Sequence, residues 1–152
     1  ICLPNINGAE VINSWIKITK NSYRNLRYEE VQPGVIFNDG YIKVTAVPTL
    51  HTECSYAYFM EAEGKSVLFT GDLAHPDKDF PLIAKEQETH LIVCEGAHFC
   101  ALDYLPHLKA CKTKLVHINH YQVQKIPSIL QLAKEIGNVP VKMAYDGSTI
   151  ML

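Results

Sequence analysis

Apolar residues alternate with polar or small residues over residues 42–47 (IKVTAV), and several of them are β-branched. This pattern predicts a β-strand that ends at Pro48. Residues 56–62 and 66–70 form two further strand-like runs, which the turn at 63–65 (EGK) joins into a hairpin because glycine supplies the turn conformation. The centre of the chain is therefore expected to be an antiparallel sheet.

Two residues with metal-binding side chains flank this hairpin. His51 follows the strand that ends at Pro48, and Asp72 follows the last strand of the hairpin. Because a hairpin brings its outer ends together, His51 and Asp72 are expected side by side at one edge of the sheet. An imidazole and a carboxylate are suitable ligands for zinc, iron or manganese.

The rest of the chain predicts further strands and helices around this hairpin. Apolar residues at helical spacing predict a helix over 9–19, whose buried face Trp15 is expected to anchor. Hairpin-connected strands come first and strands alternating with helices follow, which is typical of a layered α/β domain with sheets in the middle and helices outside. Helices are also expected over 77–88, 101–111 and 126–136, and strands over 1–3, 35–37, 91–94, 115–118, 141–144 and 149–152.

Composition limits the classes of function. A length of 152 residues allows one domain, residues 1–152, with a substantial core. A formal net charge of −2 gives no bulk attraction to nucleic acid or anionic lipid, so a nucleic-acid partner is not expected. No apolar run approaches the roughly 20 residues of a membrane span. The five cysteines lack Cys-x-x-Cys spacing and indicate reduced thiols in a cytoplasmic protein.

Potential ligands recur where apolar strands end. His51, Asp72 and His120 each follow a predicted strand, and Glu95 with His98 follows the apolar run that ends at Cys94. Sheets of α/β proteins commonly build their sites from polar groups just past the strand ends. An isolated histidine there is often only a surface residue, but several such positions together favour a site.

Four segments of the sequence resemble the metallo-β-lactamase superfamily: VPTLHT…SYAYFMEAEGKSVLFTGD, LIVCEGAHF, LVHINHY and VKMAYDGSTIML. The resemblance implies an αββα sandwich, in which two mixed sheets carry helices on their outer faces. It also implies that His51 completes a first metal site, that Asp72 bridges two metals, and that His120 is a ligand of the second. Asp72 and His120 are the residues expected to take part in catalysis.

The same resemblance implies an activity. Two divalent ions, most often zinc in this family, with iron or manganese possible, would activate a water for hydrolysis of an ester, a lactone or a phosphodiester. The substrate is expected to be a small molecule.

One departure from the family is large. The motif His-x-His-x-Asp-His is absent, and the chain begins at Ile1 without a methionine. We therefore expect the C-terminal part of a longer protein, with a sandwich incomplete at its N-terminus. The chain alone is expected to hold metal weakly, or one ion, or none. Uncovered sheet surface would favour self-association into a homo-oligomer.

Three further residues are candidates for substrate contact or for supporting the metal ligands. His75 lies three residues after Asp72 and is equally compatible with a solvated loop. Glu95 and His98 occupy the place of a short His-Glu-Ala-Thr motif in the ribonuclease Z-like branch, where this chain has Cys94 for the histidine and Gly96 for the alanine. These changes weaken a tRNA-processing interpretation.

Two other functions remain open at this stage. The same ligands suit iron, so an iron-dependent oxidoreductase on the same fold is one alternative. A non-catalytic remnant used for interaction is the other. His117 lies within a predicted strand and is expected to have a structural role.

Overall fold

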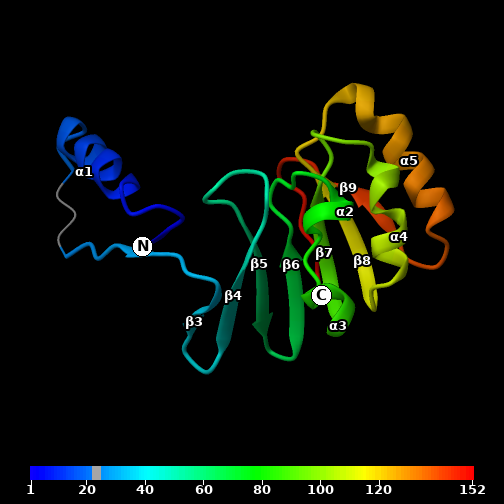
Figure 1. Cartoon of the computed structure of the whole chain (residues 1–152), viewed down its shortest axis with the longest axis horizontal. Coiled ribbons are helices and arrows are strands. Elements are labelled where there is room, and N and C mark those ends of the chain that lie inside the picture. The colour runs from blue at the N-terminus through cyan, green and yellow to red at the C-terminus, as the bar shows by residue number, and fades with distance from the viewer. Residues whose placement is uncertain (22–24) are drawn as a thin grey trace.

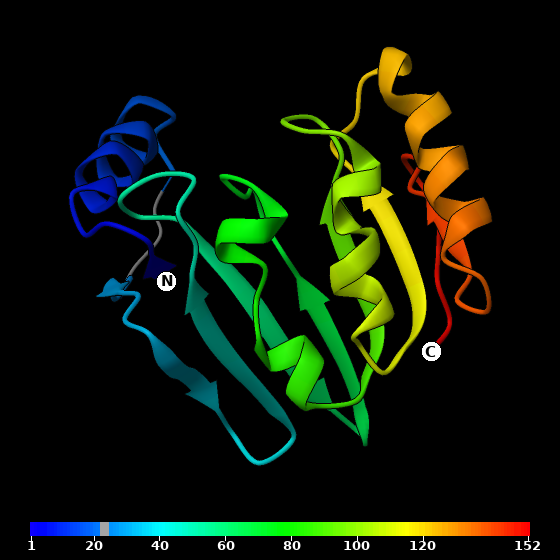
Figure 2. The ribbon, with the colours of Figure 1, turned by 45° about the vertical axis from the view of Figure 1, so that its right-hand side comes forward.

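The computed structural model describes residues 1–21 and 25–152. These residues form a seven-stranded mixed sheet with helices on one of its faces (Figure 1, Figure 2). The strands lie side by side in sequence order. They are β3 (Gly34–Asn38), β4 (Ile42–Pro48), β5 (Tyr56–Ala62), β6 (Lys65–Phe69), β7 (Thr89–Glu95), β8 (Thr113–Asn119) and β9 (Val141–Met143). The predicted layered α/β class is thus confirmed.

The pairing directions decide where the loops meet. Strands β3 to β6 pair antiparallel, and β6 to β9 pair parallel. Strand β4 therefore runs in the same direction as β6, β7 and β8. The segments that follow these four strands all leave the sheet at one edge.

Short helices cover one face of the sheet, as Figure 2 shows. The residues of the strands that face them are fully buried, including Phe59, Leu68, Ile92 and Val116. The helices are α2 (Pro76–Asp79), α3 (Ile83–Glu86), α4 (Leu105–Lys109) and α5 (Ile126–Glu135), with 3₁₀ turns η1 (Ala101–Tyr104) and η2 (Val123–Lys125). None of the helices in the described residues is both long and apolar enough to cross a membrane.

The opposite face of the sheet, which we call the open face, is apolar but only partly covered. One row of cross-strand neighbours on it runs from Phe37 through Val44, Met60 and Val67 to Leu91. A parallel row contains Phe69, whose exposed fraction is 41%. Large apolar residues with this exposure are unusual in the middle of a sheet, so the open face favours association.

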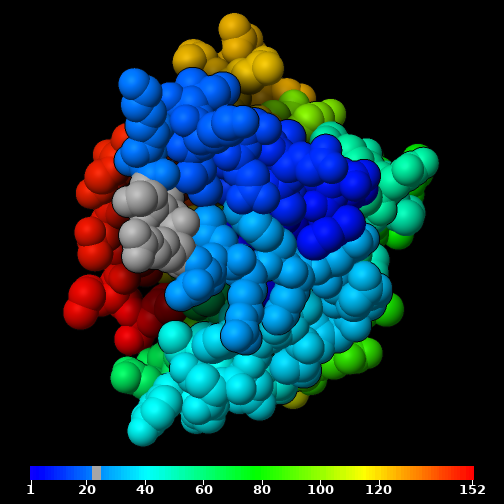
Figure 3. Space-filling model, turned by 90° about the vertical axis from the view of Figure 1, so that its left-hand side faces the viewer, coloured from blue at the N-terminus to red at the C-terminus, as the bar shows by residue number. Residues whose placement is uncertain are grey.

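The N-terminal residues form a small separate unit. Strands β1 (Cys2–Leu3) and β2 (Glu29–Glu30) pair parallel, and α1 (Gly8–Ile18) lies beside them. In the space-filling view of this end, the blue residues of β1 and α1 lie above the cyan residues of β3 and β4 (Figure 3). The expectation that Trp15 anchors a buried face was wrong: its exposed fraction is 67%, because Ile12 and Ile16 occupy the less exposed side of α1.

Two predicted elements differ from the structure. The single helix expected over 77–88 is two short helices, because Phe80 takes an extended conformation (ψ 126°) immediately before Pro81. A residue before proline is sterically disfavoured in the helical region, so the helix ends there. The segment 149–152, where a strand was expected, is irregular and pairs with none of the strands in the described residues.

Gly71 is expected to tolerate no side chain. Its φ is +61°, and an added Cβ would lie 2.9 Å from the carbonyl oxygen of Tyr56. Gly71→Ala should reduce the free energy of unfolding by about 2–4 kcal/mol, the sum of left-handed strain and an overpacked contact. Gly64→Ala is the matched control, because Gly64 has φ +72° with open space around it. If urea titrations showed that the two variants lose the same free energy of unfolding, the steric contact at Gly71 would be contradicted.

Self-association remains a prediction that the open face supports. In a solution of the purified chain, only another copy can cover these apolar residues. Sedimentation velocity should therefore show a weight-average mass that rises with concentration. Phe69→Thr, which removes the exposed ring but keeps a β-branched residue, should weaken the association at least several-fold. A single species at the monomer mass of 17.1 kDa over the whole concentration range would rule the prediction out.

Candidate metal centre

Five side chains capable of binding a metal come together at the edge where β4, β6, β7 and β8 end. His51 follows β4, Asp72 follows β6, Glu95 is the last residue of β7 with His98 three residues later, and His120 follows β8. The shared direction of these strands is what gathers residues that are distant in the sequence.

Asp72 lies at the centre of the group. Its Oδ1 is 3.0 Å from Nδ1 of His120, and its Oδ2 is 3.9 Å from Nε2 of His51. The ring centroid of His98 lies 4.7 Å from that of His51 and 5.5 Å from that of His120. One potential ligand atom from each of Asp72, Glu95, His98 and His120 falls within 4.8 Å of the others.

Unusual backbone conformations bring these loops close. Gly71 turns the chain just before Asp72 with φ +61°, and His120 itself has φ +44°, which is uncommon for a residue with a side chain. Gly96 packs so tightly that a Cβ would lie 2.8 Å from Cγ2 of Ile118. The loops after β7 and β8 can therefore approach each other only with glycine at position 96.

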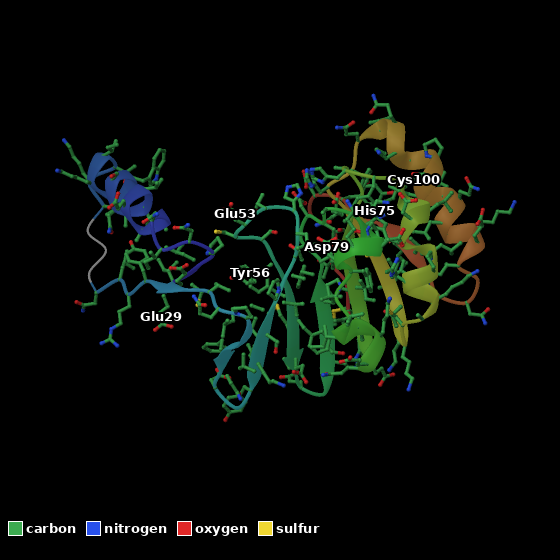
Figure 4. All side chains as sticks on the ribbon, in the orientation of Figure 1. Glu29, Glu53, Tyr56, His75, Asp79 and Cys100 are labelled. Carbon is green, nitrogen blue, oxygen red and sulfur yellow. The ribbon has the colours of Figure 1, made fainter. Side chains whose placement is uncertain are left out.

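Asp79 holds two of the loops together. Its carboxylate accepts hydrogen bonds from the backbone N–H groups of Leu50 at 2.7 Å, Ala74 at 3.0 Å and His75 at 3.1 Å. Figure 4 shows Asp79 near the start of the helical layer, beside the loop that follows β4. The loop containing His51 is thus tied to the loop that follows Asp72.

Glu95 is buried, with an exposed fraction of 2%. Its Oε2 accepts from the N–H groups of Ala97 at 2.9 Å and His98 at 3.1 Å, and its Oε1 accepts from the N–H of Leu73 at 3.2 Å. Nδ1 of His98 lies 3.0 Å from both oxygens. Glu95 therefore organises the loop after β7 around its own carboxylate.

The structure places His75 outside the group. Its ring caps α2, where Nδ1 accepts from the N–H of Asp77 at 3.2 Å, and Nε2 lies 3.5 Å from Oδ2 of Asp103. Figure 4 shows His75 on the helical side of the sheet, near Cys100. A role for His75 in substrate contact stays a prediction.

His117 and Cys94 have the surroundings of structural residues. His117 is buried on β8, and both burial and the nearby Lys142 lower the pKa of its imidazole. Burial raises the pKa of the Cys94 thiol well above its usual value. A thiol that stays protonated is a poor metal ligand.

The ligand chemistry of the group fits a divalent metal. Metal–ligand bonds of ~2.0–2.2 Å in tetrahedral geometry require ligand atoms about 3.3–3.6 Å apart. The two separations measured from Asp72, 3.0 Å to His120 and 3.9 Å to His51, lie on either side of that value. Carboxylate and imidazole ligands of this kind suit zinc, iron and manganese.

Sequence reasoning anticipated where most of these residues lie but missed Asp79. The structure brings together His51, Asp72 and His120, as expected from the strand ends, although their roles as ligands stay a prediction. Asp79 was expected only within a helix over 77–88. Pro81 indicates that the helix ends near Asp79, but nothing in the sequence pattern indicates that this carboxylate accepts from the loops.

No family model matches the chain, and no curated protein matches it by sequence. Solved structures do match. The metallo-β-lactamase fold protein YhfI from Bacillus subtilis has a TM-score of 0.66 and 19% identity over 87% of this chain and 59% of its own. The short form of human tRNase Z has a TM-score of 0.67 and 13% identity over 94% of this chain and 64% of its own.

A third structure, a proposed Zn-dependent hydrolase of the metallo-β-lactamase superfamily from Thermotoga maritima, has a TM-score of 0.58 and 18% identity over 77% of this chain and 72% of its own. At these identities the comparisons establish the fold: the chain has the metallo-β-lactamase fold. It spans only 59% to 72% of the length of these three structures.

Asp79→Ala should loosen the two loops that Asp79 joins. The substitution leaves three backbone N–H groups without their carboxylate partner, which should cost about 1–3 kcal/mol of unfolding free energy. The amide of Leu50 should also exchange hydrogen at least tenfold faster. Asp146→Ala, at an exposed turn, is the control and should change neither quantity. Unchanged exchange at Leu50 would show that the loops are held by other contacts.

Proposed function

We propose that this chain contributes to a metal-dependent hydrolase, in which His51, Asp72 and His120 bind divalent metal, zinc foremost. The substrate would be a small molecule with an ester, lactone or phosphodiester bond. The observation that carries the proposal is the convergence of two imidazoles on one carboxylate at a sheet edge. The fold shared with two structures that are described as metal-dependent hydrolases supports it.

The orientation of Asp72 supports a bridging role. One of its oxygens faces His120 and the other faces His51, so the carboxylate presents an oxygen to each of two neighbouring positions. A bound divalent metal would supply Lewis-acid polarisation of the scissile group and a water of lowered pKa. The role of this chain would be to hold the ligands at these separations and to keep both oxygens of Asp72 directed at the site.

The charges of the site also favour a cation. Asp72 and Glu95 bring two carboxylates into one group of side chains. Neutral histidines do not offset them, whereas a divalent ion does. The site is partly exposed, with 35% of the Asp72 side chain accessible, so that a substrate can reach it.

Hydrolysis itself is proposed for a longer protein that contains this chain. The resemblance implies further histidine ligands in a His-x-His-x-Asp-His motif, which this sequence lacks. The ligands in this chain make up only part of that set. For the 152-residue chain we therefore expect metal binding, and weaker binding than the complete ligand set would give.

Isothermal titration of the purified chain with zinc or manganese chloride tests the proposal. Binding is expected, and Asp72→Asn should weaken the affinity at least tenfold because it removes the shared carboxylate. Asp146→Asn is the control for loss of an exposed carboxylate. Absence of binding by the unaltered chain at millimolar metal would overturn the proposal.

The identity of the reaction needs a second measurement. In the longer protein, zinc- or manganese-dependent cleavage of the phosphodiester bis(p-nitrophenyl) phosphate or of an aryl ester would support hydrolysis. Iron-dependent consumption of oxygen would instead support an oxidoreductase. Binding of no metal by the longer protein would indicate that the fold serves only for interaction.

A further inference from the structure

We propose that His98 is an additional metal ligand, which binds through Nε2, and that the buried carboxylate of Glu95 positions it. The inference rests on the proposed function, because it concerns the same metal. It assigns different roles to two neighbouring residues that both lie within 4.8 Å of Asp72 and His120. By proximity alone, either residue could be the ligand.

The hydrogen bonds of Glu95 exclude it as the ligand. An ionised carboxylate has about four lone-pair positions. Three are taken by the backbone N–H groups of Leu73, Ala97 and His98, and Nδ1 of His98 approaches both oxygens at 3.0 Å. A cation bound by Glu95 would have to displace some of these N–H donors. Because the exposed fraction of Glu95 is only 2%, water cannot take the place of the lost hydrogen bonds.

The same bonds determine the tautomer of His98. An ionised carboxylate has no proton to donate, so it can act only as an acceptor towards His98. Nδ1 of His98 is therefore the donor and carries the proton. Neutral imidazole with its proton on Nδ1 presents a lone pair on Nε2. In the described part of the chain, no protein group forms a hydrogen bond with Nε2 of His98. A histidine held by a carboxylate at one nitrogen is the arrangement by which proteins orient metal-binding imidazoles.

The position of the ring supports the assignment. His98 lies between the two other histidines, with ring centroids 4.7 Å from His51 and 5.5 Å from His120. The tight packing of Gly96 against Ile118 and Tyr121 brings the loop that carries His98 against the loop that carries His120. The ligand set in this chain is thus three histidines and one aspartate, and Glu95 positions one of the histidines, His98, through its Nδ1.

The tautomer can be observed directly in the metal-free chain. A long-range ¹H–¹⁵N correlation spectrum at pH 8 should show His98 with its proton on Nδ1 and an unprotonated Nε2. Addition of zinc chloride should shift the Nε2 resonance and leave Nδ1 protonated. Observation of the proton on Nε2 would overturn the proposal without reference to any variant or to activity.

Affinity provides the second test. His98→Asn should weaken zinc binding by about 10–100-fold, while the thermal unfolding temperature of the metal-free chain stays close to that of the unaltered protein. His90→Asn is the matched control, because His90 is a partly buried histidine of β7, at the end of the strand far from the loop that carries His98. The control should bind zinc normally.

The outcomes separate the two proposals. Zinc binding that is unchanged in His98→Asn would overturn the role of His98 and leave His51, Asp72 and His120 as the ligands. If the unaltered chain binds no zinc, both proposals fail together. Weakened binding in His98→Asn but not in His90→Asn, with the Nδ1–H tautomer, would establish His98 as the ligand that Glu95 positions.

Discussion

The common direction of β4, β6, β7 and β8 is the constraint on which the site depends. Residues from four separate segments can meet only because these strands end at one edge. The register is fixed by the row of buried residues beneath the helices, Phe59, Leu68, Ile92 and Val116, each of which pairs with the next across the sheet. A slip of one residue would turn this row towards the open face and expose it. The burial that stabilises the sheet therefore also fixes the position of every candidate ligand.

Two carboxylates convert this alignment into a defined site. Loops at a strand edge have backbone N–H groups that the sheet cannot satisfy, and such groups need other partners when water is excluded. Asp79 accepts from three of them in the loops around His51 and Asp72. Glu95 accepts from three more, two of them at Ala97 and His98 and one at Leu73, beside Asp72. Neither residue needs to touch a metal to matter. Each reduces the freedom of a loop that carries a ligand.

The sequence predicts the strands better than the helices because their signals differ in kind. Strands β4 to β8 contain β-branched and aromatic residues bounded by clear turns, so their approximate limits follow from the pattern. The region 77–88 has helical spacing, but the local effect of Pro81 on Phe80 overrides it. Trp15 illustrates a different difficulty, since hydrophobicity does not reveal which side of a helix finds a partner.

The site shows the same division. The positions of His51, Asp72 and His120 follow from the ends of the strands, which can be recognised in the sequence. The tasks of Asp79 and Glu95 depend on which backbone N–H groups surround them, and this is decided only when several loops have folded. A carboxylate in a sequence is equally compatible with a metal, a helix terminus or solvent. Its hydrogen-bond partners in three dimensions distinguish these roles.

The site and the open face lie on different parts of the sheet and have different supports. The loops that carry the ligands rest on the helical layer, where Phe99 packs against Tyr104 at 5.1 Å and Tyr104 against Phe80 at 6.1 Å between ring centroids. All three rings are buried, and burial raises the pKa of Tyr104 above its usual range. The open face contributes none of the five candidate side chains. The geometry of His51, Asp72, His98 and His120 therefore depends on the loops at the strand ends and on the helical layer beneath them, and the open face has no direct part in it.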